Sequence, residues 1–166
     1  MIKMAWASKF NKLSGTSADL DLGASEALPA RKFGELIYHS LKTGDDKRHI
    51  LTMNNDSNSD YSSRHSLDGG VDSTGTSQPY MDTQYTGDSN KLHIWSFINI
   101  GAEEKLFIGH IVESDADGAG TAPHRIERVH KYTDTATGQI TRIDSSKGVG
   151  ADYKVDDLAT VILTDD

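Results

Sequence analysis

The clearest hydrophobic pattern in the chain is a strict alternation over residues 92–100. One face would carry Leu92, Ile94, Ser96, Ile98 and Ile100, and the other His93, Trp95, Phe97 and Asn99. A period of two predicts a β-strand. Both faces are largely apolar, so we expect a central strand that is covered on both sides. Residues 104–112 follow a short turn and alternate in the same way, which predicts an antiparallel hairpin.

Shorter apolar runs predict further strands along the chain. They lie at residues 48–53, 61–65, 125–132, 139–144 and 158–163. Turn-forming residues separate them at intervals of about 8 to 12 residues, which is typical of an all-β sandwich. The predicted fold is therefore all-β, an antiparallel jelly-roll-like β-sandwich of about eight strands with long polar loops.

Residues 29–42 fit two templates. Phe33, Leu36, Ile37 and Leu41 have helical spacing, and Pro29 at the start suits a helix. A strand would instead place Phe33 and Ile37 on one face and Leu36 on the other. The local pattern slightly favours the helix.

The first 18 residues predict an N-terminal arm ahead of a β-sandwich domain formed by residues 19–166. The side chains expected to be buried in this lead-in are Phe10, Leu13, Leu20 and Leu22. Trp6 either packs back onto its own domain or reaches a neighbouring subunit, because chain ends are loose unless they are tied down.

Residues 66–90 almost lack apolar side chains and predict a long surface loop or a partly disordered segment. Tyr80, Met81 and Tyr85 would be exposed there unless they touch a partner. Aromatic residues and Met anchor many protein interfaces. Together with Trp6 and Phe10 they form the candidate interface residues.

Composition narrows the function classes. The chain has 166 residues, which suits one domain, and a net charge of -8, which disfavours binding to nucleic acid or an anionic membrane. It has no cysteine, which excludes disulfides and thiolate metal sites. Residues 1–10 lack the apolar core of a secretory signal, and no segment has the roughly 20 apolar residues of a membrane helix.

The polar segment 54–60 is the main candidate for a ligand site. Asp56, Asn58 and Asp60 resemble the start of a calcium loop, but Tyr61 and Leu67 stand where an EF-hand needs Gly and Glu. A self-bonded turn is the alternative, since Asn, Asp and Ser bond to their own backbone and tolerate left-handed conformations. No cofactor is predicted apart from loosely bound calcium at these residues.

No catalytic motif is found, and the prediction is a non-enzymatic protein. The seven histidines, which form no metal-binding pattern, predict half-buried or surface side chains on strands: His39, His49, His65, His93, His110, His124 and His130. Trp95, Phe97 and Phe107 predict an aromatic ladder in the core, with a carbohydrate platform as the alternative.

Four segments resemble a group of small structural proteins of tailed bacteriophages, often from marine or environmental viruses. They are the run ALPARKF at residues 27–33, the turn at 53–56 that ends in Tyr61, the strand at 106–108 and the run QITRI at 139–143. In that group a PAR run leads into a strand, an N-D…N-Y turn follows, and a late QI-x-x-I strand recurs. The resemblance covers residues 20–163 and favours a strand over residues 29–42, which we adopt.

The resemblance implies a β-sandwich component of the virion without enzyme activity. Our first hypothesis is a capsid decoration or cement protein. It would contact the major capsid protein and stabilise the particle as a homo-oligomer, a dimer or trimer, after synthesis in the host cytoplasm. The alternative is a tail fibre or collar module that recognises host glycan through loops 54–60 and 114–121. A polysaccharide-degrading enzyme is a weaker third hypothesis.

Overall fold

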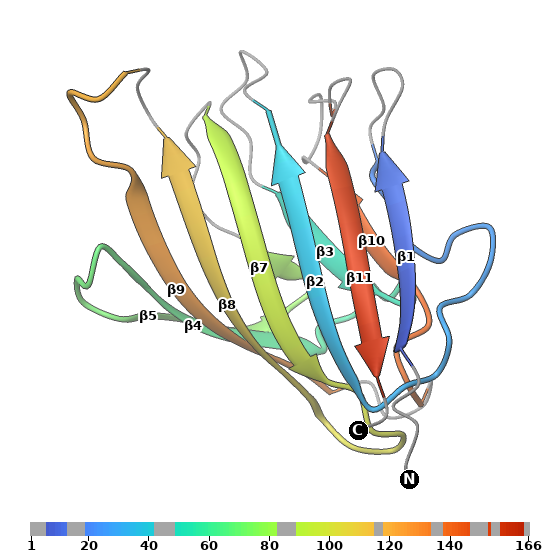
Figure 1. Ribbon diagram of the computed structural model, residues 1–166. Coiled ribbons are helices and arrows are strands. Elements are labelled where there is room, and N and C mark those ends of the chain that lie inside the picture. The colour runs from blue at the N-terminus through green and yellow to red at the C-terminus, as the bar shows by residue number, and fades with distance from the viewer. Residues whose placement is uncertain are drawn as a thin grey trace, which may run out of the picture.

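The computed structural model describes residues 6–12, 19–41, 49–82, 89–114, 118–133, 138–146, 153 and 157–164. Within these residues the chain has eleven strands and no helix, and every strand pairing is antiparallel. The strands form two sheets that face each other (Figure 1). The predicted all-β, antiparallel β-sandwich is confirmed, while the jelly-roll connectivity stays a prediction.

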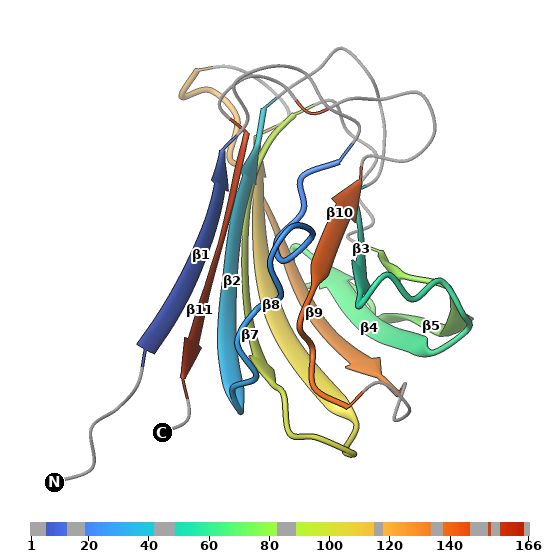
Figure 2. The ribbon, with the colours of Figure 1, turned by 90° about the vertical axis from the view of Figure 1, so that its right-hand side faces the viewer.

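The large sheet has eight strands. Their order across the sheet is β1 (Trp6–Lys12), β11 (Leu158–Thr164), β2 (Phe33–Ser40), β7 (Asn90–Ile98), β8 (Lys105–Ser114), β9 (His124–Tyr132), β4 (Tyr61–Leu67) and β5 (Ser73–Gln78). The sheet is not flat, and its β4–β5 end curls round toward the small sheet (Figure 2).

The small sheet has three strands, β10 (Ile143–Ser146), β3 (Ile50–Met53) and β6 (Met81–Asp82). It lies against the concave inner face of the large sheet (Figure 2). Leu20 and Leu22, predicted to be buried, are indeed in the core, and their segment adds single bridges from Asp19 and Leu22 to β10. The predicted burial of Leu13 falls outside the described residues.

The core lies between the inner face of the large sheet and the small sheet. Strict alternation of buried and exposed residues along β7 and β8 shows that only one face of each strand is covered. The inner face carries the predicted aromatic ladder, with Trp95, Phe97 and Phe107 almost fully buried. The rings of Phe97 and Phe107 stack with centroids 5.1 Å apart, which confirms their assignment to the core.

Two glycines make room for the largest core side chains. Gly109 on β8 pairs with Trp95 on β7, and Gly34 on β2 pairs with Phe97. A Cβ on Gly109 would lie 2.1 Å from the Trp95 ring, and a Cβ on Gly34 would lie 2.2 Å from the Phe97 ring. Each aromatic ring therefore occupies the space of the missing side chain on the neighbouring strand.

The strand adopted for residues 29–42 is confirmed as β2. Leu36 and Tyr38 are buried on its inner face, and Ile37 lies on the opposite face as predicted. The helical spacing is overridden because β2 pairs with β11 on one side and with β7 on the other. Strand pairing on both edges satisfies its backbone groups throughout.

The prediction of a structureless segment at residues 66–90 is wrong where the structure describes it. Residues 73–78 form β5, which pairs with β4, and Met81 and Asp82 form β6. The β4–β5 turn has two residues with positive φ, Asp68 at 50° and Gly69 at 74°. These two residues form a tight turn, closed by a hydrogen bond of 2.8 Å from the Gly70 amide to the Leu67 carbonyl, within a five-residue connection between the strands.

The predicted strand at 139–144 is displaced to residues 143–146. The residues before it bond to side chains instead of a neighbouring strand. Asn99 accepts a hydrogen bond from the Ile140 amide at 2.5 Å, and Asn54 accepts one from the Thr141 amide at 2.8 Å. Two buried or half-buried asparagines thus hold this segment across the end of the sandwich.

The N-terminal region differs from the predicted arm where it is described. Residues 6–12 form β1, an edge strand of the large sheet that pairs with β11 along its whole length. Phe10, which was expected to be buried, is 62% exposed, because the register of β1 places it on the outer face. The division into residues 1–18 and 19–166 otherwise stays a prediction, since residues 1–5 and 13–18 lie outside the described ranges.

Candidate interaction surface

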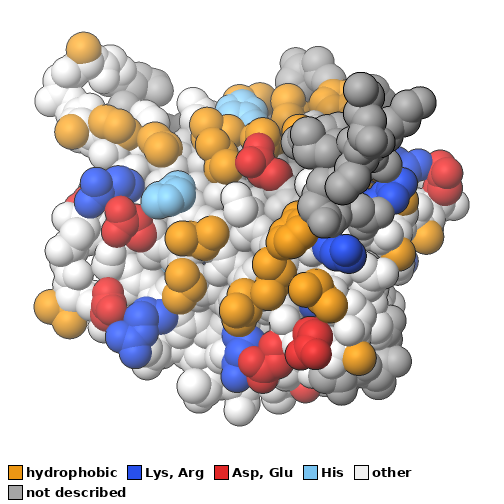
Figure 3. Space-filling view, turned by 60° about the horizontal axis from the view of Figure 1, so that its bottom comes forward, with side chains coloured by type: hydrophobic (Ala, Val, Ile, Leu, Met, Phe, Trp, Pro, Cys, Tyr) orange, Lys and Arg blue, Asp and Glu red, His pale blue; other side chains and the backbone are white. Residues whose placement is uncertain are grey.

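The outer face of the large sheet, which points away from the small sheet, carries an exposed apolar patch. Alternate residues of β2, β7, β8 and β9 form this outer apolar patch: Phe33, Leu92, Ile94, Leu106, Ile108, Val112 and Val129. Their side chains are between 39% and 55% exposed. Figure 3 shows hydrophobic side chains gathered on this side of the molecule, with charged side chains around them.

The strand register brings several of these side chains together, although Ser96 pairs with Ile108 and His110 with Ile94 on the same face. Leu92 pairs with Val112 across β7 and β8, and Ile108 pairs with Val129 across β8 and β9. Monomeric soluble proteins rarely expose contiguous apolar patches larger than a few hundred Å². A patch spread over four adjacent strands is therefore a candidate surface for contact with another protein.

A groove of about 800 Å³ runs over one end of the patch. Phe33, Leu106, Ile108 and Val129 form much of its lining, and polar residues of β4 and β5 complete it. Its floor is a strand surface rather than a closed cavity, so it suits side chains from another protein surface better than a small enclosed ligand.

Charged side chains stand around the patch and also between its members, since Arg125 pairs with Val112 and Glu127 with His110. Glu35 lies on β2 at one side, while Arg64 on β4 and Lys131 on β9 lie at the other. Arg64 pairs with Asp72 at 3.1 Å and Lys131 with Glu104 at 3.3 Å, both at the surface. Exposed ion pairs contribute only about 0–1 kcal/mol, so both bases are able to exchange partners when another surface approaches.

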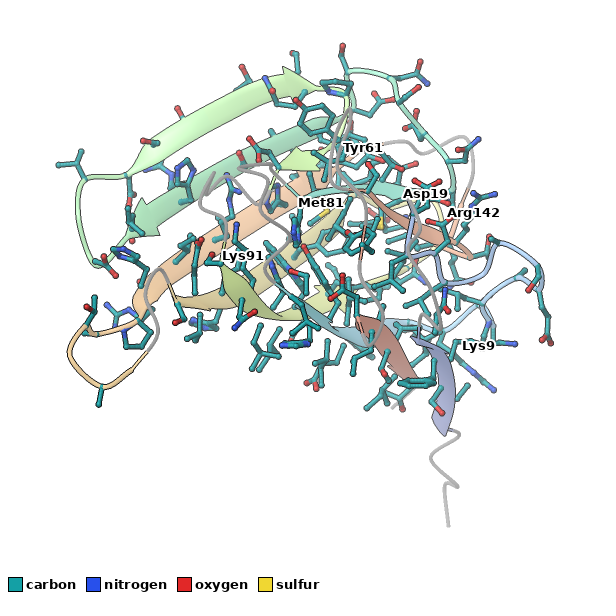
Figure 4. All side chains as sticks on the ribbon, turned by 90° about the horizontal axis from the view of Figure 1, so that it is seen from above. Lys9, Asp19, Tyr61, Met81, Lys91 and Arg142 are labelled. Atoms are coloured by element: carbon teal, nitrogen blue, oxygen red, sulfur yellow. The ribbon has the colours of Figure 1, made fainter. Side chains whose placement is uncertain are left out.

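The candidate interface residues do not come together in this patch. Phe10 is exposed on the outer face, but Met81 is completely buried beside Leu51 on the small sheet, so it has no surface to offer a partner. Figure 4 shows Met81 in the interior of the molecule. Tyr80 is half-buried. The side chain of Trp6 and all of Tyr85 lie outside the described residues.

The segment 54–60 forms a self-bonded turn, which was one of its two predicted states. Asn54 and Asn55 adopt left-handed conformations, with φ of 56° and 57°. Asp56 is buried, and its Oδ1 accepts hydrogen bonds from the amide and the side chain of Asn58 at 2.9 and 2.7 Å. Across the described part of the chain, no group of three or more His, Asp or Glu side chains is arranged to hold a metal ion.

The prediction of half-buried or surface histidines is wrong for three of them, His49, His93 and His130, which are buried. The His93 ring stacks on Tyr38 with centroids 3.9 Å apart, and Nδ1 of His49 lies 2.9 Å from the Tyr38 hydroxyl oxygen. Neither ring nitrogen of His93 forms a hydrogen bond with a described residue. Burial therefore holds the pKa of His93 well below its usual value, and nearby His49 and Lys91 act in the same direction.

A buried ion pair lies near the same end of β7 and β8. Lys91 Nζ is 3.3 Å from Glu113 Oε1, with side chains 3% and 0% exposed. The Ser89 hydroxyl also donates to Glu113. Burial of both charges requires that they compensate each other. The inner face therefore includes buried charged side chains as well as aromatic ones.

Acid is expected to destabilise the fold through His93 and His130. Burial, with nearby Arg128, lowers the pKa of His130 to about 3. Both rings stay neutral in the folded protein while the unfolded chain takes up protons below about pH 6.5. Their contribution to stability is thus complete above pH 6.5 and falls as the pH drops toward 3, by roughly 4 kcal/mol for the pair between pH 7 and 5.

Asp21 acts in the opposite direction. Burial and the neighbouring Asp144 raise its pKa to about 6, so it loses stabilising effect as the pH rises through 6 and offsets about 1 kcal/mol of the acid loss. Urea unfolding at pH 7 and pH 5 measures the sum. His93→Phe, which keeps the stacked ring, should remove about half of the histidine contribution. An unchanged acid sensitivity in that variant would contradict the lowered pKa, because it would show that His93 takes up its proton equally readily in the folded and unfolded chain.

Comparison with known protein families and with curated proteins finds no match for this chain. The described residues include no helix long and apolar enough to cross a membrane. The outer apolar patch is therefore the feature of the described chain that most directly indicates what the protein contacts. Sequence reasoning did not identify it as a site, although it predicted the apolar character of these positions.

Proposed function

We propose that this chain is a non-enzymatic structural subunit that acts by burying the outer face of its large sheet against neighbouring protein subunits. The observation that carries the proposal is the outer apolar patch, whose most exposed members are Ile108 and Leu106, at 55% and 50%. Removing apolar surface from water is favourable by about 25 cal/mol per Å², so such a face has a strong tendency to associate. An apolar face of this breadth suits a protein that works inside an assembly.

The sequence resemblance specifies the assembly as a virion. In this proposal the chain is a decoration or cement protein on the capsid of a tailed bacteriophage, in contact with the major capsid protein. The acidic net charge of -8 is compatible with a site on the outside of a capsid, away from nucleic acid. An antiparallel sandwich whose exposed large apolar side chains are mostly on one face suits a structural role.

The test is to find the chain in purified particles. Phage particles from the source culture are banded on a density gradient, and each band is analysed by quantitative mass spectrometry. We expect the chain in the particle band at a fixed ratio to the most abundant capsid protein, and we expect that ratio to survive a salt wash, because an apolar contact is not screened by salt. Recovery of the chain only from the soluble fraction would contradict the proposal.

A further inference from the structure

We infer that the occupant of the outer apolar patch is a second copy of this chain, packed sheet to sheet. This inference rests on the proposed function, and it names the first partner of the same surface. The dimer would be the unit that enters the larger assembly. Contacts with other proteins would then use the remaining surface of the pair.

The area of the patch fits a dimer of modest affinity. The patch spans β2, β7, β8 and β9, with Glu35 on β2 at one margin. Four strands at about 4.8 Å spacing and about seven residues along each give a footprint of roughly 450 Å². With the margins, each copy would bury about 600–800 Å², at the lower limit of stable protein interfaces.

The arrangement of charges also fits a second copy. A two-fold axis parallel to the strands, between β7 and β8, would place β2 of one copy opposite β9 of the other. Glu35 at one margin would then face the margin that carries Lys131 and Arg64. The same contact would occur twice, as an isologous interface requires. Aligned packing at about -30° is the usual geometry for two twisted sheets.

The sequence pattern of β7 and β8 also predicts a cover for their outer face. β7 and β8 are apolar on both faces, which is the pattern of strands covered on both sides. The small sheet covers the inner face, and no described segment of the chain covers the outer one. A second copy would supply the missing layer with a surface of the same apolar character.

Sedimentation equilibrium of the full chain tests the inference. The wild-type protein should show a concentration-dependent mass that rises from 18.1 kDa toward twice that value. Ile108→Lys should weaken self-association at least about tenfold, because a charge would enter the centre of the contact. The matched control is Val71→Lys, which places the same charge at a 94% exposed apolar residue on the β4–β5 turn. This control should associate like the wild type.

A charge exchange tests the relative orientation of the copies. Glu35→Lys should weaken the dimer, and the double variant Glu35→Lys with Lys131→Glu should restore it. Circular dichroism should show an unchanged fold in each variant, because both positions are at the surface. If only the charge exchange fails, the two-fold arrangement is overturned.

A monomeric wild-type protein at all concentrations would overturn the inference, as would a dimer that Ile108→Lys leaves intact. A monomer that is nevertheless present in the particle band would leave the proposed function standing and assign the patch to a different subunit. If the chain forms a stable dimer but is absent from particles, the inferred dimer stands and the proposed function is contradicted.

Discussion

Lys91→Met is expected to destabilise the protein by about 3–5 kcal/mol. Lys91 and Glu113 are both buried and lie 3.3 Å apart. Removing the ammonium group leaves the carboxylate of Glu113 in a low-dielectric interior without the cation that compensates its charge. Urea unfolding at pH 7, followed by circular dichroism, measures the change.

The matched control for this prediction is Lys9→Met. Lys9 pairs with Glu26, but the side chains are 31% and 78% exposed. Exposed pairs contribute about 0–1 kcal/mol, so this variant should unfold almost like the wild type. The double variant Lys91→Met with Glu113→Leu should recover most of the loss, because apolar side chains of similar size replace both charges. Equal, small effects for Lys91→Met and Lys9→Met would show that water reaches the buried pair.

Gly109→Ala is expected to destabilise the protein by about 3 kcal/mol, the upper end of the usual range for overpacking. The added methyl carbon would lie 2.1 to 2.5 Å from three atoms of the Trp95 ring. Trp95 is fully buried at the centre of the sheet, so neither the ring nor the β8 backbone has space to yield. Thermal unfolding gives the loss, and a red shift of tryptophan fluorescence would report displacement of the ring.

The control for this substitution is Gly120→Ala. No atom lies within 4 Å of the position that its Cβ would take. The variant should therefore have nearly wild-type stability or gain up to about 1 kcal/mol from a less flexible unfolded chain. If Gly109→Ala behaved like this control, the tight packing of Trp95 on β8 would be contradicted.

The eight predicted strands all have a counterpart in the described structure, although β2 was adopted from the resemblance and β10 is displaced, and the three that were missed share a physical cause. β1, β5 and β6 are edge or very short strands with little apolar content, so they carry almost no alternation. Their backbones pair because a neighbouring strand offers free hydrogen-bonding groups. The pair Asp68–Gly69 was a usable turn signal, since both residue types favour turns, although the connection that it begins is five residues long.

The sequence predicts that the residues of the outer apolar patch are apolar, but it does not predict that they are exposed. Alternation placed Leu92 and Ile94 on one face of β7 and Trp95 on the other, as observed. Two apolar faces predict a strand that is covered on both sides within one molecule. Sequence alone cannot say whether the second cover comes from the same chain, because this depends on how many layers the chain forms. The structure has one cover, and the other face stays exposed.

The alternation of inward and outward residues along β9 also predicts its buried polar side chains. His130 and Arg128 alternate with exposed residues of β9 and share their face with the buried Ile126 and Tyr132. Residue type suggested the surface, since basic side chains are rarely buried. Alternation along the strand predicts the burial of these groups better than residue type does, because the same sheet supplies neighbours that shield them.

The most direct test of the account is the reactivity of a thiol placed in the outer apolar patch. The chain has no cysteine, so Ile108→Cys and the control Val71→Cys each carry a single thiol. We predict that Ile108→Cys reacts with a maleimide at least about tenfold more slowly in the assembled protein than after dissociation by dilution, because buried interface atoms exclude solvent. Val71→Cys should react at one rate in both states. Equal reactivity of Ile108→Cys in the assembled and dissociated protein would show that the outer face is not a contact surface.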